Sequence, residues 1–320
     1  ALHQWFVQAR AEGVPISGTI VQAQAEKFDR QLNGEESTFK ASTGWLDRFK
    51  KHHGISQVSV AGEVRSADTQ AAKGYPDRLK EIISESGYSP EQIYNADGTG
   101  LCYKMLPDKT LASKTVAHKH EGYKKLKDRA TILFCANKTG GHKIKPLCIG
   151  KSQNPRCFNH VNRTTLPLSY DFSNKAWMTS TIFEKWFHKE FVLAVRKHLR
   201  QQRLEPKALL LLDNCPAHPP ASNLVSRDGK IRVSYLPKNT TSKIQLMDQG
   251  VISTFKTIYR RELVRKIVDD ERPVQEFLKS VNIKEMIHLA GQSWNAVSAI
   301  SIEKCWMKGL APSFPTCLFI

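Results

Sequence analysis

The spacing of hydrophobic and polar positions changes along the 320-residue chain and divides it into four parts. Residues 1–54 carry apolar side chains at helical spacing and predict three short helices. Residues 55–75 are polar and weakly patterned, which indicates a linker. Residues 76–310 alternate short apolar runs with long amphipathic segments, and residues 311–320 form a tail. The pattern therefore predicts a small all-α domain followed by a larger domain that contains strands.

The third expected helix, capped by Ser42 or Thr43, separates aromatic from basic side chains. Trp45, Leu46 and Phe49 face inward and hold the helix in place, whereas its positively charged side chains face outward. Three short helices of which the last is basic on its outer face are typical of a helix-turn-helix domain that binds DNA. The residues expected at base edges or phosphates are Arg48, Lys50, Lys51 and His52. An ordinary helical bundle with a solvated charged face fits the same pattern.

Short apolar runs in the larger domain predict strands at residues 92–97, 130–141, 142–151, 208–213 and 231–237. Long amphipathic segments predict helices at residues 180–204 and 248–270. Three strands come first, and strands then alternate with helices. This order predicts an α/β fold in which a mixed sheet is flanked by helices.

Basic side chains outnumber acidic ones and concentrate in one segment. The formal net charge is +18, and residues 101–165 contain 14 Lys and Arg against three Asp and Glu. This excess predicts a polyanionic partner, most naturally double-stranded DNA. The residues expected on its phosphates are Lys124, Lys125, Lys127 and Arg129. A basic surface without a partner, or a scaffold that binds RNA or an acidic protein, are the other interpretations. A membrane partner is not expected, because no apolar run approaches the roughly 20 residues needed to span a bilayer.

Two of the expected strands end on a carboxylate. The run "ALLLL" before Asp213 is apolar on both faces and predicts a central buried strand, so Asp213 emerges at its carboxyl end. Asp97 ends the first strand in the same way, and Asp248 opens the last long helix. Three carboxylates at one rim of a sheet supply oxygen ligands for Mg²⁺ or Mn²⁺. Two such ions support phosphodiester chemistry, so these residues are the candidate catalytic and metal-binding residues.

Each carboxylate has another interpretation when it is taken singly. Asp248 fits a favourable charge at a helix N-terminus, and Asp97 fits a turn. Asp213 also fits the metal-binding acid of a nucleotide hydrolase, but that class needs a phosphate loop, and Lys145 stands where the loop requires glycine. His218 follows Asp213 by five residues. It either orients a phosphate or a metal-bound water, or it caps the next helix.

Several motifs resemble the Tigger and pogo group of the Tc1/mariner superfamily, including the jerky-like proteins derived from it. They are "YNADGTGL", "LLLLDNCPAH", "YLPKNTTSKIQLMDQGVISTFK" and "WNAVSAISIEKCW". The stretch "FKASTGWLDRFKKHHGI" resembles the second half of a centromere-protein-B-type DNA-binding region. The first helix-turn-helix of that pair is missing, and the sequence does not begin with Met, so we expect a part of a longer protein.

The resemblance implies an RNase H-like endonuclease domain with a catalytic triad at Asp97, Asp213 and Asp248. It implies metal-dependent cutting and joining of DNA at transposon ends, and a location in the nucleus. Many relatives are host genes that kept DNA binding and lost mobility, so a domesticated DNA-binding role is expected, with an active Mg²⁺-dependent transposase as the alternative. A homodimer is one assembly consistent with this. Seven scattered cysteines without a Cys-x-x-Cys pair agree with a reducing compartment.

Two departures from the family pattern affect the expected site. Gly98 stands where the family has Glu after the first Asp, and we expect it to loosen a loop that carries Asp97. Lys238 and Leu246 stand where the family has proline in the segment before Asp248.

Overall fold

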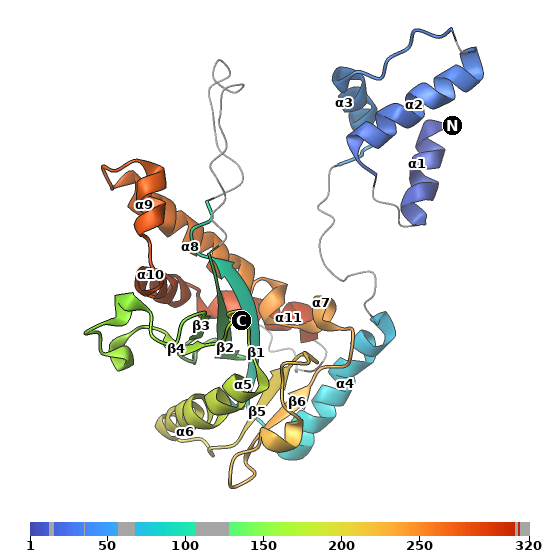
Figure 1. Cartoon of the computed structure of the whole chain (residues 1–320). Coiled ribbons are helices and arrows are strands. Elements are labelled where there is room, and N and C mark those ends of the chain that lie inside the picture. The colour runs from blue at the N-terminus through green and yellow to red at the C-terminus, as the bar shows by residue number, and fades with distance from the viewer. Residues whose placement is uncertain (13–15, 35, 57–67, 107–127, 311–312, 314–320) are drawn as a thin grey trace. The chain divides into compact units, whose positions relative to one another are not determined.

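The computed structural model describes residues 1–12, 16–34, 36–56, 68–106, 128–310 and 313. The chain divides into two compact units, Ala1–Gly62 and Glu63–Ile320 (Figure 1). Each unit has its own buried core, and the two are described separately below.

The first unit consists of the helices α1 (Leu2–Ala11), α2 (Gly18–Asn33) and α3 (Thr43–His52). The hydroxyl of Ser42 accepts the backbone N–H of Trp45, so the predicted cap of α3 is present. Leu46 of α3 packs closely against the start of α2, because a Cβ on Gly18 would lie 2.7 Å from Leu46 Cδ2. The ring of Trp45 stacks on that of Phe49 at 5.4 Å. These contacts hold α3 by its apolar side, as the sequence predicted.

The second unit begins with the helix α4 (Thr69–Ser86). This helix starts inside the segment 55–75 that the sequence analysis takes as a linker. The reason is a capping residue, since the carboxylate of Asp68 accepts the backbone N–H groups of Gln70 and Ala71.

Six strands form one mixed sheet in the order β4-β3-β2-β1-β5-β6. They are β1 (Ile93–Cys102), β2 (Arg129–Asn137), β3 (Leu147–Gly150), β4 (Ser169–Phe172), β5 (Ala208–Leu212) and β6 (Ile231–Tyr235). The neighbours β1, β2 and β3 are antiparallel, whereas β5 runs parallel to both β1 and β6. The short turn between β2 and β3 and the crossovers between the later strands agree with the predicted order.

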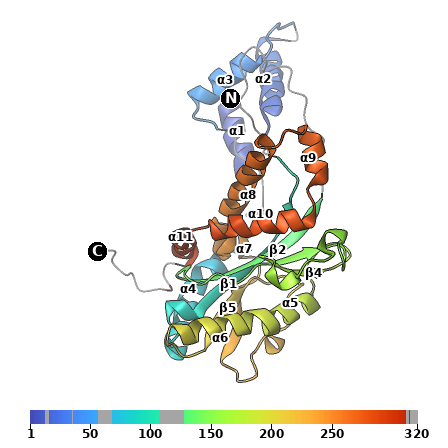
Figure 2. The ribbon, with the colours of Figure 1, turned by 90° about the vertical axis from the view of Figure 1, so that its left-hand side faces the viewer.

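Helices cover both faces of the sheet (Figure 2). On one face lie α5 (Ser180–Trp186), a π-helical turn (Phe187–Phe191) and α6 (Val192–Gln201). On the other lie α8 (Val251–Val268) and α10 (Ile283–Asn295). The strand β5 separates two cores, because Leu210 belongs to the core under α5 and α6 whereas Leu209 and Leu211 belong to the core under α8 and α10. This is the buried central strand that the apolar run predicted.

The second unit therefore has the predicted α/β fold, an RNase H-like mixed sheet flanked by helices, and the first unit is the predicted small helical domain. Four helices of the second unit were not named from the sequence, α10 and, in addition, α7 (Thr241–Ile244), α9 (Val274–Ser280) and α11 (Ala299–Leu310). The strand β4 was also missed, since its side chains are half-buried or exposed and carry no apolar alternation. Among the helices that the structure describes, none has the length and apolar character required to cross a bilayer.

Candidate functional site

The parallel pairing of β1 with β5 places two of the predicted carboxylates side by side. Asn95 lies opposite Leu211 in this pairing. The ladder ends there, and two residues beyond it on each chain segment lie Asp97 of β1 and Asp213, which directly follows β5. Neighbouring strands lie about 4.8 Å apart, so the two side chains leave adjacent backbones at one rim of the sheet.

Asp97 lies inside β1 and not at its end, which corrects the prediction. The strand continues to Cys102 because β2 offers an antiparallel partner along its whole length. Gly98 pairs with Leu133 in this ladder, so the expectation that it loosens a loop is wrong. A Cβ at Gly98 would meet the methyl group of Thr131 at 3.9 Å, an ordinary contact. The strand would therefore accept a larger residue at this position. With Gly98 present, Asp97 is still held by the pairing of β1 with β2.

A buried pair of amide side chains links the segments that carry the three acids. Asn95 donates to a carbonyl of β5 at 3.0 Å and to Oε1 of Gln245 at 2.7 Å. Gln245 in turn donates to a carbonyl of β1 at 3.3 Å, and the N–H of Met247 donates to Oδ1 of Asn95 at 3.1 Å. Both amide residues are 0% exposed. The pair ties β1 and β5 to the turn Met247–Gln249, which holds Asp248.

Asp248 occupies a three-residue turn just before α8, where its side chain is exposed. Leu246, which replaces the family's proline before this turn, has a φ of −68°. A proline ring fixes φ near the same value, so the leucine preserves the backbone path. Its side chain is 1% exposed and contributes to the core instead.

The pKa of each of the three carboxyl groups is raised, and for Asp97 and Asp248 the charge of a neighbouring acid contributes. Burial holds the pKa of Asp97 well above its ordinary value, and the charges of Asp248 and Asp213 raise it further. Partial desolvation of the Asp248 carboxyl raises its pKa, although the residue remains largely accessible to solvent, and the charge of Asp213 raises it further. Burial also raises the pKa of Asp213, whereas nearby His218 acts in the opposite direction. The acids therefore lie close enough to repel one another, and a cation between them would relieve this repulsion.

His218 contacts Asp213 directly and does not cap the next helix. Its Nδ1 lies 3.0 Å from the backbone carbonyl oxygen of Asp213 and 3.3 Å from its carboxylate. The imidazole sits beside the rings of Phe183 and Tyr235, with centroid distances of 4.5 and 6.2 Å. The short helix Ala221–Asn223 that follows has no side-chain cap. His218 is thus placed to orient the Asp213 carboxylate.

A cation missed in the sequence analysis stands beside the acids. Lys256 of α8 donates through Nζ to the hydroxyl of Thr99 on β1 at 2.7 Å. Burial and then Arg260 lower the pKa of Lys256, while Asp248 and Asp97 raise it. Lys256 follows Asp248 by eight residues, close to two helical turns, and this spacing was the available sequence signal.

The donor set suits a hard divalent cation, since it consists of carboxylate oxygens. Within the part of the chain that the structure describes, no three or more His, Cys, Asp or Glu side chains are already arranged to hold a metal ion. The three acids are therefore near enough to repel but are not gathered around one point. Their side chains must draw together to share an ion, which mutual repulsion opposes until the cation binds.

The basic residues predicted on α3 differ in their surroundings. Arg48, Lys51 and His52 are exposed. Lys50 is half-buried and forms an ion pair with Asp47 at 2.8 Å. Arg48, Lys51 and His52 are therefore accessible to a partner, whereas the ion pair between Lys50 and Asp47 would have to break before Lys50 could bind one.

The basic residues predicted to bind phosphates near the triad are described only in part. Lys124, Lys125 and Lys127 lie outside the residues that the structure describes. Arg129 is the first residue of β2 and is exposed, and it pairs with Cys102 at the far end of β1. Of these four residues, Arg129 alone belongs to the part of the chain that the structure describes.

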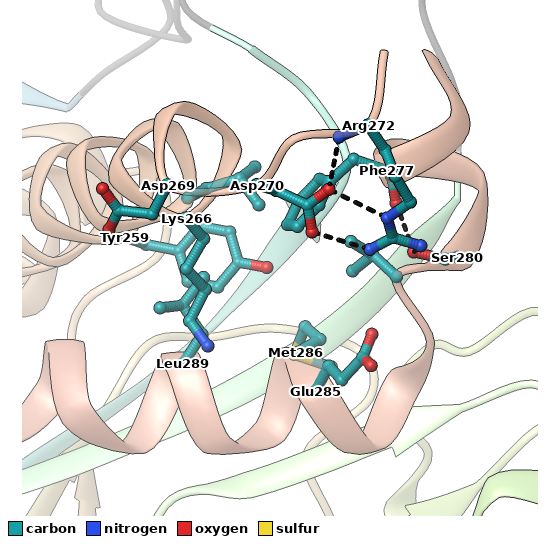
Figure 3. Close-up of a pocket in the computed structure, with 12 residues that line it drawn as sticks. Tyr259, Lys266, Asp269, Asp270, Arg272, Phe277, Ser280, Glu285, Met286 and Leu289 are labelled. Atoms are coloured by element: carbon teal, nitrogen blue, oxygen red, sulfur yellow. Dashed lines mark hydrogen bonds and ion pairs between the residues drawn. The ribbon is translucent and has the colours of Figure 1, made fainter. Parts of the chain in front are cut away.

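A separate cavity of about 290 Å³ lies between α8, α9 and α10. Figure 3 shows Arg272 holding the carboxylate of Asp270 with two N–H groups, both at 2.8 Å. None of the three acids lines this cavity, so the candidate site is the rim of the sheet.

Comparisons with known proteins agree with this architecture. Residues 127–306 match the family described as DDE superfamily endonuclease, and residues 1–59 match the Tc5 transposase DNA-binding domain. The chain is 38% identical over 309 residues to the Jerky protein of Mus musculus, covering 96% of this chain and 52% of the relative. It is 37% identical over 321 residues to the human Tigger transposable element-derived protein 7, covering 96% of this chain and 58% of the relative.

Solved structures with a similar chain include the Mos1 transposase paired-end complex with left transposon end. The transposase chain in that complex shares 13% sequence identity with this chain, and the two superpose with a TM-score of 0.43. The match covers 97% of this chain and 86% of the transposase chain. The chain spans about half the length of the curated relatives it matches. Because the endonuclease model matches more than half of its residues, the chain belongs to the DDE superfamily endonuclease family, among the transposase-derived proteins that include Jerky and the Tigger-derived proteins.

Proposed function

We propose that this chain is part of a nuclear, transposase-derived DNA-binding protein whose Asp97, Asp213 and Asp248 form a metal-dependent site for cleaving phosphodiester bonds. The observation that carries this proposal is the buried Asn95–Gln245 pair, which ties together the three segments that bear the acids. A chain that only binds DNA has no need for this link. The repulsion among the acids supports the proposal further, because the fold keeps them together at a cost.

The residues around the rim have distinct tasks in this proposal. Asp97, Asp213 and Asp248 would hold Mg²⁺ or Mn²⁺, which when bound would activate a water or a 3′-hydroxyl and stabilise the leaving oxygen. His218 keeps the Asp213 carboxylate oriented through its contact at 3.3 Å. Lys256 places a positive charge next to the acids, where it offsets the negative charge of an approaching phosphodiester.

The helical unit would supply the affinity for double-stranded DNA. Its α3 helix is held by apolar contacts on one side and exposes Arg48, Lys51 and His52 on the other. The match of this unit to a transposase DNA-binding domain supports the same use. A protein that binds and cuts chromosomal DNA acts in the nucleus, which is the location we propose.

Metal-dependent nicking is the direct test. The chain is expected to convert supercoiled plasmid to open circles in Mn²⁺ and more slowly in Mg²⁺, and to do nothing in EDTA, because the cation draws the acids together. The measurement is gel separation of the plasmid forms over time, with Asp213→Asn as the matched variant.

The variant separates cleavage from binding. Asn keeps the shape of Asp213 but removes the charge that a divalent cation needs, so Asp213→Asn should bind the plasmid like the parent and leave it supercoiled. Nicking by both proteins would point to a contaminating nuclease or to another site. If neither nicks while both bind DNA equally, the acids are an inherited scaffold in a domesticated DNA-binding protein.

Arg48 is expected to contribute to sequence discrimination. In duplexes selected by the chain from a random pool, Arg48→Ala should weaken binding by roughly five- to a hundredfold, because a bidentate Arg–guanine contact contributes about 1–3 kcal/mol. Binding to unselected duplex should weaken much less. Fluorescence anisotropy at fixed salt measures both affinities.

Lys50 offers a control on the same helix. Its ammonium already pairs with Asp47, so Lys50→Ala is expected to have a smaller effect on the selected duplex. An equal loss on selected and unselected DNA for Arg48→Ala would reassign Arg48 to a phosphate contact.

A further inference from the structure

Trp177 is an exposed indole on a surface segment that is otherwise well anchored. Its side chain is 56% exposed, whereas Trp186, Trp294 and Trp306 are at most 2% exposed. A single exposed aromatic residue is common on protein surfaces and needs no explanation by itself. What sets Trp177 apart is how the chain around it is held and which charge lies next to it.

The backbone on both sides of Trp177 is locked by hydrogen bonds. Ser173 accepts the N–H of Trp177 at 2.8 Å through its hydroxyl, which donates to the Trp177 carbonyl at 2.7 Å. Ala176 is fully buried with a φ of 53°, a left-handed conformation that costs a non-glycine residue about 1 kcal/mol. Its carbonyl accepts the hydroxyl of Thr131 on β2 at 2.7 Å. The fold thus fixes the segment while leaving the indole in solvent.

A cation lies beside the indole. The guanidinium carbon of Arg129 is 5.7 Å from the centre of the Trp177 ring. The same guanidinium rests on the backbone of Gly100, where a Cβ would come within 2.5 Å of its Nε. The neighbouring carboxylate of Asp128 is engaged elsewhere, with Lys104 at 3.0 Å. Among the described residues, Arg129 has no carboxylate partner, and its described neighbours are the Trp177 ring and the Gly100 backbone.

This pair is near the proposed cleavage site along β1 but lies on the other face of the sheet, because Asp97 and Gly100 are an odd number of residues apart and so face opposite sides. Gly100 lies three residues after Asp97 on β1, or about 10 Å along the strand. Gly100 and Thr131 are cross-strand partners, so Arg129, Trp177 and Gly100 share one side of the sheet. Beyond Asn95 no described strand pairs with the β5 edge of β1, where Gln245 binds the Ala96 carbonyl, and a DNA strand held at Asp97 would have to cross this edge to reach the pair.

We propose that Trp177 and Arg129 form a platform for an unpaired nucleobase of the DNA strand at the cleavage site, with Trp177 stacking on the base and Arg129 binding the adjoining phosphate. Aromatic faces and arginine guanidinium groups are the groups with which proteins bind single-stranded nucleic acid without reading its sequence. The proposal rests on the proposed DNA binding of the chain. It adds a substrate preference, namely duplex DNA with an unpaired end.

The experiment compares two labelled duplexes that differ only in a short 3′ overhang, bound in EDTA by proteins that all carry Asp213→Asn. The parent should prefer the overhang. Trp177→Ala should lose about five- to a hundredfold in affinity for the overhang duplex, the range for removing one base–aromatic stack. It should bind the blunt duplex unchanged. Trp177→Phe should retain most of the preference, because a smaller ring still stacks.

Leu193→Ala serves as the control, since Leu193 is 60% exposed on α6 and lies on no proposed path of DNA. It should leave both affinities unchanged. An unaltered overhang affinity in Trp177→Ala would overturn the platform and leave Trp177 as a surface for a protein partner. An equal loss on both duplexes would overturn it as well. Failure of the parent to bind the blunt duplex would instead contradict the proposed function, so the two failures are distinguishable.

Discussion

Asp97→Asn is expected to abolish nicking and, at the same time, to make the metal-free protein more stable. The loss of nicking should reach at least about a hundredfold, the effect of removing one group that stabilises transition-state charge. The gain in stability has a separate cause. Asp97 is held among Asp213 and Asp248, and asparagine keeps its hydrogen bond from the Gly98 N–H at 2.7 Å without adding to their repulsion.

The stability gain should depend on pH in a defined direction. The pKa of Asp97 in the folded protein lies well above its ordinary value, so the folded state binds the proton more tightly than the unfolded state. Stability of the parent is therefore lost as pH rises above about 3.9 and through the folded pKa. Below about pH 3.9 both states of the parent are protonated, and this penalty disappears. The difference between Asp97→Asn and the parent should thus be largest at neutral pH.

Thermal unfolding in EDTA at several pH values measures this difference, at about 2–4 °C in Tm for each kcal/mol of relieved repulsion. Adding Mn²⁺ should raise the Tm of the parent and leave that of Asp97→Asn nearly unchanged, since only the parent keeps all three ligands. A variant that is less stable than the parent at neutral pH would contradict the account of repelling acids. Retained nicking would remove Asp97 from the catalytic set.

Asn95→Ala is expected to damage both stability and cleavage. Its side chain makes three hydrogen bonds, at 2.7, 3.0 and 3.1 Å, and their removal leaves buried partners unsatisfied on Gln245, β5 and Met247. Each unsatisfied buried group costs about 1–3 kcal/mol, so a total loss of about 2–4 kcal/mol is expected after partial relaxation. The turn that carries Asp248 also loses its anchor, and nicking should fall at a temperature where the variant is still folded.

Asn137 provides a matched control, because it is a second fully buried asparagine on the neighbouring strand. It binds Glu91 at 2.7 Å and the N–H of His142 at 3.0 Å, away from the acids. Asn137→Ala should lower the free energy of unfolding by a similar amount and leave nicking per folded molecule unchanged. If the two variants lose nicking in proportion to their stability alone, the Asn95–Gln245 pair is only a structural contact. Denaturant unfolding measures the free energy of unfolding of both variants, and plasmid nicking at low temperature measures their cleavage rate per folded molecule.

Much of the fold could be predicted from the sequence because burial leaves a regular pattern. The run from Ala208 to Leu212 is apolar at every position, and the structure buries all five residues on both faces of the sheet. The third helix of the first unit was likewise readable from its cap and its apolar side. The strand β4 could not be predicted, because its side chains at the edge of the sheet are half-exposed and show no apolar alternation.

The candidate site was predictable only as a list of acids. Strand ends and helix starts pointed to Asp97, Asp213 and Asp248, but the position of Asp97 inside β1 depends on its pairing with β2, which is distant in sequence. His218 left two interpretations open; the structure shows no helix cap by His218 and a contact with Asp213 that neither interpretation named.

Local periodicity and composition were enough to predict the division into a helical and an α/β unit and the buried central strand, and they pointed to the three acids. The contacts of Asn95 with Gln245, of Lys256 with Thr99 beside the acids, and of Arg129 with Gly100 and Trp177 became visible only in the folded chain. Each of these contacts joins side chains from elements far apart in the sequence, which local patterns do not record. Their distances and their effects on charge arise only when the sheet and its helices are assembled.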